Sequence, residues 1–340
     1  MEKKPIFHRL AMAFGIAFLG TGILACGSST GESSEKTGTV KPTAAVLSSF
    51  NADSAYAHIA RQVSFGPRVP GSAGHRLCRQ YIISALENYG ADSIIVQDTS
   101  VTAFNGDRLP ISNIFARFGT ETRRHILLVA HWDTRPWGDN EHDRTLRSKP
   151  IPGANDGGSG VGVLLEIARN LQIKRPEIGV DLLFVDAEDY GTNEGFGSNP
   201  ESWCLGTQHW VTDMPYTSGN MPKYGILLDM VGGRNARFHY EAGSKKYAPA
   251  ILQKVWNEAH ALGFGSKFIQ KPSGVIIDDH VYLSEAGIPT IDIIESLNEE
   301  TASFNPTWHT HDDNLENIDR KSLDAVGKTV MNVVYKEIDK

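Results

Sequence analysis

The sequence predicts an α/β sandwich: one domain whose mixed, mainly parallel central sheet is flanked by helices. Continuous apolar runs, HILLVA from residue 125 and VDLLFV from residue 180, are typical of strands buried on both faces. Segments with helical spacing of apolar residues alternate with such runs along the chain. That alternation favours strand–helix–strand units and a parallel sheet.

From residue 51 onward the expected elements follow one another without an obvious linker. ADSAYAHIARQVSF and HRLCRQYIISALENYG each carry one apolar face, as amphipathic helices do. Two β-rich runs, SIIVQDTSV and ISNIFARF, come next and lead us to expect mixed edges in the sheet. The buried strands are expected at 125–130, 180–185, 224–231 and 288–294, with helices at 160–172, 248–263 and 322–338.

The first 50 residues indicate export. A positively charged start precedes the apolar stretch AMAFGIAFLGTGILA, which is too short for a comfortable membrane span. "LAC" at Cys26 resembles a bacterial lipoprotein signal, so we predict a signal peptide over 1–25 and a lipid on Cys26. An ordinary secretory signal is the alternative. Residues 26–50 are polar and are expected to form a flexible tether.

Charge and cysteine content narrow the classes of partner. A net charge of -7 over 340 residues gives no broad basic field, so nucleic acid is not expected as a partner.

We expect a monomer on the periplasmic side of a cell membrane, the outer membrane, held there by its lipid. Export permits a disulfide, and Cys78 and Cys204 are either one bridge or two buried small residues.

Acidic and histidine side chains follow the ends of the buried strands. His131 and Asp133 follow the first apolar strand, Glu188 and Asp189 follow the second, and Asp229 lies near the end of the third. In open α/β sheets, ligands bind beyond the carboxyl ends of the strands. The sequence therefore predicts one polar site at that edge of the sheet.

Each of these residues, taken alone, also has a purely structural interpretation. Asp156 precedes the glycine-rich run GGSGVG and can cap the following helix, an interaction worth roughly 1 kcal/mol, which is the interpretation we favour for it in isolation. His131 alone is more commonly a hydrogen-bonded buried histidine than a ligand. His280 either orients neighbouring acids or is structural, and Asp313 is typical of an acid at a helix start.

Residues from about 66 to 323 resemble the zinc-dependent aminopeptidase superfamily and, within it, the glutaminyl-peptide cyclotransferases (glutaminyl cyclases). The superfamily motifs are AHWD, GANDGGSG, DAED, LLDM and WHTHDDN, in that order. FGPRVPGS, IIDDH and the pair Trp308–His309 are narrower features of the cyclases. With the lipoprotein-like start, the whole resembles a bacterial cyclase, whose fold would agree with the strand pattern.

The resemblance implies a metal site made of three side chains. Asp156, Asp189 and His309 would bind one Zn²⁺ per chain, and Glu188 would be the general acid/base. The usual residue at position 189 is glutamate, so the shorter aspartate suggests a tighter approach to the metal.

The resemblance also assigns the surroundings of this site. Asp229 and Asp278 would form a hydrogen-bonded acidic network beside the general acid/base, and Trp308 would wall the substrate pocket, with Phe304 as a further apolar wall. Animal cyclases have a histidine where this chain has Asp292, which leaves the polarity of the pocket open.

The implied activity of the domain 51–340 is conversion of N-terminal glutamine in peptides or proteins to pyroglutamate, with release of ammonia. The alternative is a two-zinc aminopeptidase, in which His131 and Asp229 bind a second ion beside a bridging Asp156. Asp278 discriminates, because a carboxyl pair that shares a proton is a poor ligand set. A non-catalytic binding lipoprotein on the same fold is the third hypothesis.

Overall fold

The computed structural model describes residues 50–193 and 199–338, which belong to one compact unit. The expected signal peptide, the lipidation site Cys26 and the tether up to residue 49 lie outside the described residues, so these remain predictions. Among the helices of these described ranges, none combines the length and the apolar character that a membrane span requires.

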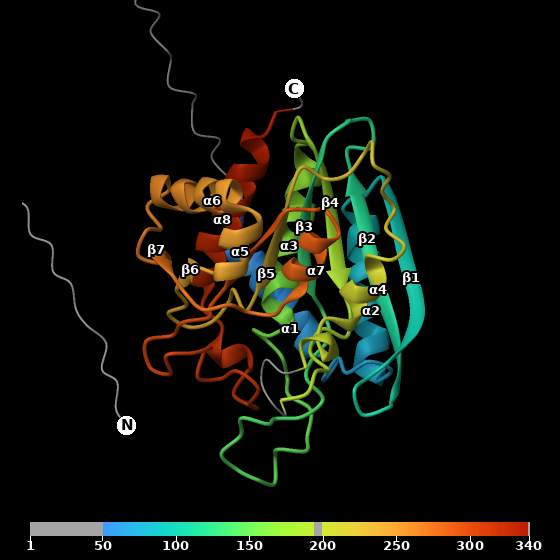
Figure 1. The fold of residues 1–340 in the computed structure, drawn as a ribbon, viewed down its shortest axis with the longest axis vertical. Helices are drawn as coiled ribbons and strands as arrows, with labels where there is room; N and C mark the ends of the chain where they lie inside the picture. The colour runs from blue at the N-terminus through green and yellow to red at the C-terminus, as the bar shows by residue number, and fades with distance from the viewer. Residues whose placement is uncertain (1–49, 194–198, 339–340) are drawn as a thin grey trace, which may run out of the picture. The chain divides into compact units, whose positions relative to one another are not determined.

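A six-stranded sheet forms the centre of the described structure, in the order β1-β2-β4-β3-β5-β8 (Figure 1). Strands β4, β3, β5 and β8 are parallel, whereas β1 and β2 run antiparallel at one edge. The expected sheet, mainly parallel with a mixed edge, is confirmed. The strands are β1 (Ser93–Thr102), β2 (Arg108–Phe118), β3 (His125–His131), β4 (Gly179–Val185), β5 (Gly225–Asp229) and β8 (Thr290–Ile294).

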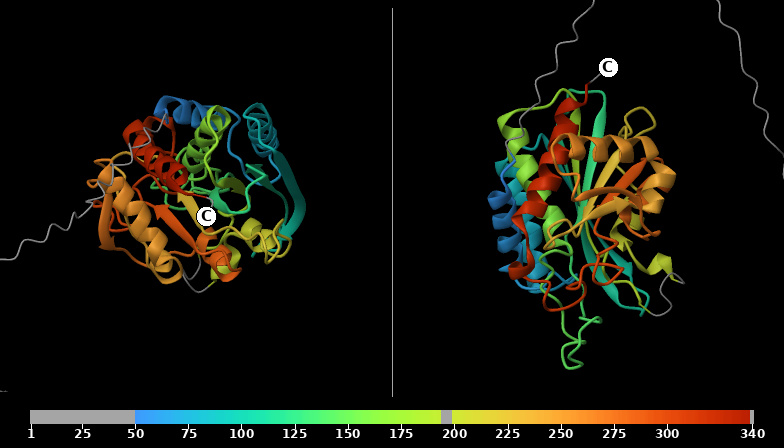
Figure 2. Two further views of the ribbon diagram at one scale, coloured as in Figure 1. Left: turned by 90° about the horizontal axis from the view of Figure 1, so that it is seen from above. Right: turned by 90° about the vertical axis from the view of Figure 1, so that its left-hand side faces the viewer.

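Helices cover both faces of the sheet (Figure 2). One face carries α1 (Ala52–Val63), α2 (Ala73–Asn88), α3 (Gly158–Ile173) and α8 (Arg320–Lys336). The other face carries two short helices, α4 (Leu205–Trp210) and α7 (Asp279–Glu285). Beside β8 lie α5 (Ala242–Tyr247), α6 (Pro249–Ala261) and the two-stranded sheet of β6 (Phe238–Tyr240) and β7 (Phe268–Pro272).

Strand β3 shows why its sequence is apolar throughout. Ile126 and Leu128 join the larger hydrophobic cluster under the long helices, while Leu127 and Val129 join the smaller cluster with Trp210 of α4. Successive side chains of a strand point to opposite faces, so a sheet covered on both sides needs apolar residues at every position.

Helix starts coincide with capping side chains. Asn51 accepts hydrogen bonds from two amides of α1, Ser72 from one amide of α2 and Asp319 from one amide of α8. Such caps satisfy amides that have no partner inside the helix. The short elements α4, α5, α7, β6 and β7 are not expected from the sequence pattern, because segments of 3–7 residues give too few positions to establish a period.

Candidate active site

A cavity of about 320 Å³ opens where β3, β4 and β5 end. Its lining includes all eight residues that the sequence implies for zinc binding, proton transfer and substrate contact: Asp156, Glu188, Asp189, Asp229, Asp278, Phe304, Trp308 and His309. The fold therefore gathers residues that are separated by up to 153 positions in the sequence (309 − 156).

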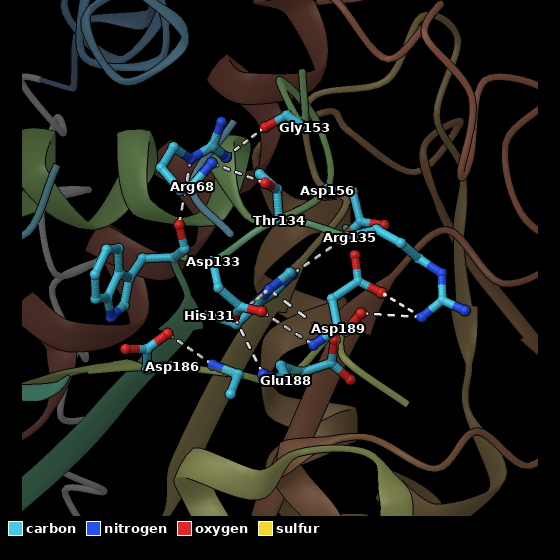
Figure 3. A network of polar contacts seen from close by, with 12 residues as sticks. Arg68, His131, Asp133, Thr134, Arg135, Gly153, Asp156, Asp186, Glu188 and Asp189 are labelled. Carbon is cyan, nitrogen blue, oxygen red and sulfur yellow. Dashed lines mark hydrogen bonds and ion pairs between the residues drawn. The ribbon is translucent and has the colours of Figure 1, made fainter. Parts of the chain in front are cut away.

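A sharp turn after β4 separates the carboxylates of the DAED segment. Ala187 adopts a left-handed conformation with φ of 48°. Asp133 accepts hydrogen bonds from the amides of Glu188 at 3.1 Å and Asp189 at 3.2 Å, which fixes the turn (Figure 3). Asp186 instead accepts from the amide of Ser112 at 2.6 Å, so it stabilises the fold and does not line the cavity.

Asp156, Asp189 and His309 place three possible ligand atoms close together. His309 Nε2 lies 3.1 Å from Asp189 Oδ1 and 3.6 Å from Asp156 Oδ2. Tetrahedral zinc with bonds of about 2.0–2.1 Å separates its ligand atoms by roughly 3.3–3.4 Å, so the three side chains fit the ion. Asp189 Oδ2 is buried and has no hydrogen-bond partner among the described residues, as expected for a carboxylate that faces a metal.

His309 is oriented by a residue that the sequence does not identify. Its Nδ1 lies 3.0 Å from Asp139 Oδ1, the carboxylate contact that a ligating histidine commonly makes. Arg135 binds Asp139 at 2.6 Å and also donates to the backbone oxygen of Asp189 at 2.9 Å. The Arg135 guanidinium carbon lies over the rings of Trp137 and Trp203, at 4.9 and 4.8 Å from their centroids.

Asp156 lies between two histidines. Its Oδ1 is 3.1 Å from His131 Nε2, and the same imidazole nitrogen is 3.1 Å from Asp229 Oδ1. The helix-cap interpretation of Asp156 is wrong. The N-cap position of α3 is occupied by Gly157, and no side chain caps this helix. A second candidate metal set, His131, Asp156 and Asp229, is therefore present beside the first.

Asp313 supports this segment from below. Its two carboxylate oxygens accept from the amides of Asn155 at 2.7 Å and Asp156 at 3.0 Å. The interpretation of Asp313 as an acid at a helix start is wrong, because α8 begins at Arg320 and Asp319 caps it. A buried carboxylate that binds successive amides fixes the backbone of the ligand-bearing loop.

The wall near α7 is rich in buried acids. Burial, together with the charge of Asp229, raises the pKa of Asp278 to about 7. Burial and the neighbouring carboxylates also raise the pKa of Asp292 well above its usual value. His280 lies behind this wall, with Nε2 3.1 Å from Glu241 and Nδ1 3.8 Å from Asp292. Carboxyl groups crowded in this way share protons near neutral pH.

Glu188 faces the cavity from the turn after β4. Its Oε2 lies 4.0 Å from His131 Nδ1, and its Oε1 accepts from the thiol of Cys204 at 3.5 Å. Burial, and then the charges of Asp278 and Asp189, raises the pKa of Glu188 well above its ordinary value despite the opposing effect of His131. A carboxyl group with a raised pKa is suited to accept and return a proton.

Aromatic and aliphatic side chains wall the cavity. The rings of Trp308 and His309 stack with centroids 3.8 Å apart, and Phe304 lies 4.4 Å from Trp308. Ile276 and Ile277 line the cavity as well. An apolar wall above a polar floor is the arrangement of a small-molecule or side-chain pocket.

Cys78 and Cys204 are both buried and free, so the possible disulfide between them is not formed. The sequence pattern assigns no role at the site to Cys204, Asp139 or Arg135. Their contacts join residues 16, 170 and 54 positions apart, respectively, and no local pattern signals such pairs.

This mainly parallel sheet, with helices on both faces and a zinc-type donor set beyond its strand ends, defines a zinc exopeptidase-like fold. Residues 113–334 match the model of Peptidase family M28, and the chain belongs to that family.

Solved structures and curated relatives make the comparison more specific. The chain is 46% identical to Bacteroides thetaiotaomicron glutaminyl cyclase, with a TM-score of 0.82 over 86% of this chain and 99% of that one. It is 48% identical to a Zn-dependent exopeptidase from Parabacteroides distasonis, with a TM-score of 0.81 over 86% and 100% of the two chains. Bovine glutaminyl-peptide cyclotransferase is 26% identical over 77% of this chain and 76% of its own length. The resemblance to glutaminyl cyclases, inferred from the motifs, is confirmed.

Proposed function

We propose that this protein is a glutaminyl-peptide cyclotransferase, which converts an N-terminal glutamine of a peptide or protein to pyroglutamate and releases ammonia. One observation carries the proposal. A single apolar-walled cavity contains a complete zinc ligand set and a separate carboxylate, Glu188, that this ligand set leaves free for proton transfer. Similarity to bacterial and animal glutaminyl cyclases supports it.

The metal ligands would be Asp156, Asp189 and His309. Zinc held there would act as a Lewis acid toward the side-chain carbonyl oxygen of the substrate glutamine. Two carboxylates and a neutral imidazole would balance most of the charge of Zn²⁺, and three protein ligands are the number typical of a catalytic zinc site. Asp139, 3.0 Å from His309, keeps the imidazole in the orientation that presents Nε2 to the site.

Glu188 would transfer the proton that the reaction moves. The neutral α-amine of the substrate attacks the carbon of its own side-chain amide, and Glu188 takes one proton from that amine. The new ring C–N bond forms, the bond to the amide nitrogen breaks, and Glu188 returns the proton to the departing nitrogen as ammonia leaves. General acid–base catalysis of this kind contributes about 10²–10⁴-fold to the rate.

The cavity walls would hold the two reacting groups together. Trp308 and Phe304 would cover the methylene groups of the glutamine side chain, and they favour a folded conformation in which amine and carbonyl meet. The nucleophile belongs to the substrate, so the apolar walls would also keep out water that competes as a nucleophile.

A two-zinc aminopeptidase is the second candidate, because His131, Asp156 and Asp229 form a second set of ligand atoms. The acids around Asp229 argue against a second ion. Burial raises the pKa of Asp229 to about 6, as it does that of Asp189, but Asp229 also has Asp278 beside it, whose pKa burial and the charge of Asp229 raise to about 7. A carboxyl pair that holds a proton binds a divalent cation poorly.

The test is to incubate the purified protein with a Gln-initiated peptide and, separately, with a leucyl-anilide. We expect ammonia and a pyroglutamyl peptide from the first and little free leucine from the second. Free leucine without ammonia would establish the aminopeptidase. If zinc is bound and neither product forms, the protein is a binding lipoprotein. The control is the Glu188→Gln variant with its zinc retained, which measures the ammonia that is released without catalysis by Glu188.

We propose, from the sequence alone, that Cys26 carries the lipid that anchors the protein to the outer membrane, on the periplasmic side. Growth with a labelled fatty acid should label the wild-type protein and leave Cys26→Ser unlabelled and detached from membranes. Equal labelling of the two proteins would contradict this anchor. The monomeric state is tested by light scattering on the detached protein.

A further inference from the structure

Cys204 lies against the turn that carries the proposed proton carrier. It is the N-cap residue of α4, fully buried, and its backbone is left-handed, with φ of 55° and ψ of 34°. Non-glycine residues rarely adopt this strained conformation, which persists where the surrounding structure requires it. The position therefore retains a side chain where glycine would be the less strained choice.

The backbone of Cys204 and its neighbour holds the turn by two hydrogen bonds. The amide of Cys204 donates to the backbone oxygen of Glu188 at 3.0 Å, and the amide of Leu205 donates to that of Ala187 at 3.0 Å. Gly206 follows, and a Cβ at this position would collide with the backbone oxygen of Asp186. The start of α4 and the turn after β4 thus form one closely packed unit.

The thiol completes this contact. Cys204 Sγ donates to Glu188 Oε1 at 3.5 Å, so Cys204 contacts both the backbone and the carboxylate of Glu188. The other carboxylate oxygen, Oε2, lies on the side of His131, 4.0 Å from its Nδ1. One oxygen is therefore fixed by the thiol while the other stays available in the cavity.

We propose that Cys204 is a positioning residue for Glu188, whose thiol orients the carboxylate toward the substrate amine. This inference rests on the proposed role of Glu188 as the proton carrier. A thiol is a weak, neutral donor. It restricts the rotation of the carboxylate without supplying the positive charge that a lysine or arginine would bring, so Glu188 remains free to gain and lose a proton.

The surroundings of the thiol keep it in the donating form. Burial, and then the charges of Asp279, Glu188 and Asp278, raises the pKa of the Cys204 thiol well above its usual value. Cys204 is not among the residues that line the cavity. Its replacement should therefore change the chemical step more than the binding of substrate.

The experiment compares Cys204→Ala with Cys204→Ser in the full-length protein, with ammonia release from a Gln-initiated peptide as the readout. Alanine removes the donor, and we expect kcat to fall about three- to tenfold with KM unchanged. Serine keeps a hydroxyl donor, and we expect it to restore most of that loss. Zinc content and Tm are measured for each variant, so that loss of the fold is recognised.

Cys78 provides the matched control, because it is also a free, fully buried cysteine, on α2 in the hydrophobic core. At a packing position, alanine should be tolerated better than serine, because a buried hydroxyl without a partner is costly. We expect that order in Tm at Cys78 and the opposite order in kcat at Cys204. If alanine is as active as serine, or more active, at Cys204, the proposal is wrong.

Two further readouts keep the inference separate from the proposed function. If the wild-type protein releases leucine and no ammonia, the cyclase proposal fails, and the Cys204 variants are then compared on leucine release, where Glu188 would still transfer the proton. If the variants do not fold, the infrared S–H band of Cys204 is compared in wild type and Glu188→Ala. A shift of that band shows the hydrogen bond, and an unchanged band overturns the proposal.

Discussion

Asp156 divides the site into two halves of unlike electrostatic character. Its Oδ2 faces His309 at 3.6 Å, and its Oδ1 faces His131 at 3.1 Å. On the His309 half, the buried cation Arg135 lies 3.6 Å from Asp189. On the His131 half, the buried acids Asp278 and Asp292 lie near Asp229.

The difference shows how two similar ligand sets can have different uses. On one half, Asp139 fixes His309, as is common for a ligating histidine. On the other half, contacts with Asp133, Asp156 and Asp229 raise the pKa of His131 well above its usual value, although burial opposes this. The charge of Asp189 raises the pKa of His309 as well, and burial raises the pKa of both Asp189 and Asp229 to about 6, so these shifts do not distinguish the halves. The neighbours do: the cation Arg135 beside Asp189 favours an ionised carboxylate, whereas Asp278 beside Asp229 has a pKa raised to about 7. The first half therefore fits a zinc ion better, and the second half fits a shared proton.

The largest expected contrast comes from removing each histidine in turn. His309→Ala should lose zinc and, with it, all measurable cyclisation, because one of three protein ligands is gone. His131→Ala should retain about one zinc ion per chain, because none of the three proposed zinc ligands is changed. Zinc measured by atomic emission after dialysis separates the two variants, and loss of zinc from both would mean that the halves are equivalent.

The second largest expected effect is the loss of activity on removing the proton carrier, Glu188. Glu188→Gln keeps the shape of the side chain but cannot accept the amine proton, so kcat for ammonia release should fall about 10²–10⁴-fold. KM and zinc content should remain near the wild-type values. A variant that keeps more than a tenth of the wild-type kcat would show that another group transfers the proton.

Asp139→Asn tests the support of the zinc half. Loss of the carboxylate beside His309 should weaken zinc binding about 10–100-fold, as measured by competition with a chelator. Asp143→Asn is the matched control, because Asp143 lies on the same loop and is exposed, and its carboxylate accepts hydrogen bonds from the amide and the hydroxyl of Thr145. Equal zinc affinities in the two variants would mean that Asp139 does not support zinc binding.

Asp279→Asn tests the buried acids of the His131 half, and its effect on the free energy of unfolding is the smallest effect that we expect. Burial raises the pKa of Asp279 from 3.8 to about 7, so the folded protein keeps a proton that the unfolded chain releases. Stability of the wild type should therefore decrease as the pH rises from about 4 to about 7. Asparagine avoids this cost, and we expect a gain of about 1–2 kcal/mol at pH 8 that shrinks toward pH 4.

Urea unfolding of both proteins across this pH range gives the comparison. The variant and the wild type should converge at low pH, where the wild-type carboxyl is protonated in both states. A gain that is the same at every pH, or a loss at pH 8, would mean that the fold does not raise the pKa of Asp279.

The fold and the individual site residues differ in how far the sequence predicts them. The buried strands can be predicted because an unbroken apolar run such as HILLVA has one common explanation. Asp156 and His131 could be placed in the site only through the order of the motifs, since each alone favours a structural role. Asp139 and Cys204 could not be predicted, because their partners are distant in the sequence and the contacts depend on the conformation of two loops.

The most direct test of the account is a titration of metal-free protein with zinc, with ammonia release from a Gln-initiated peptide followed at each addition. We predict that activity rises linearly and reaches its plateau at about one zinc ion per chain, the ion held by Asp156, Asp189 and His309. A rise that continues to about two ions per chain would contradict the division of the site into a zinc half and a proton-holding half.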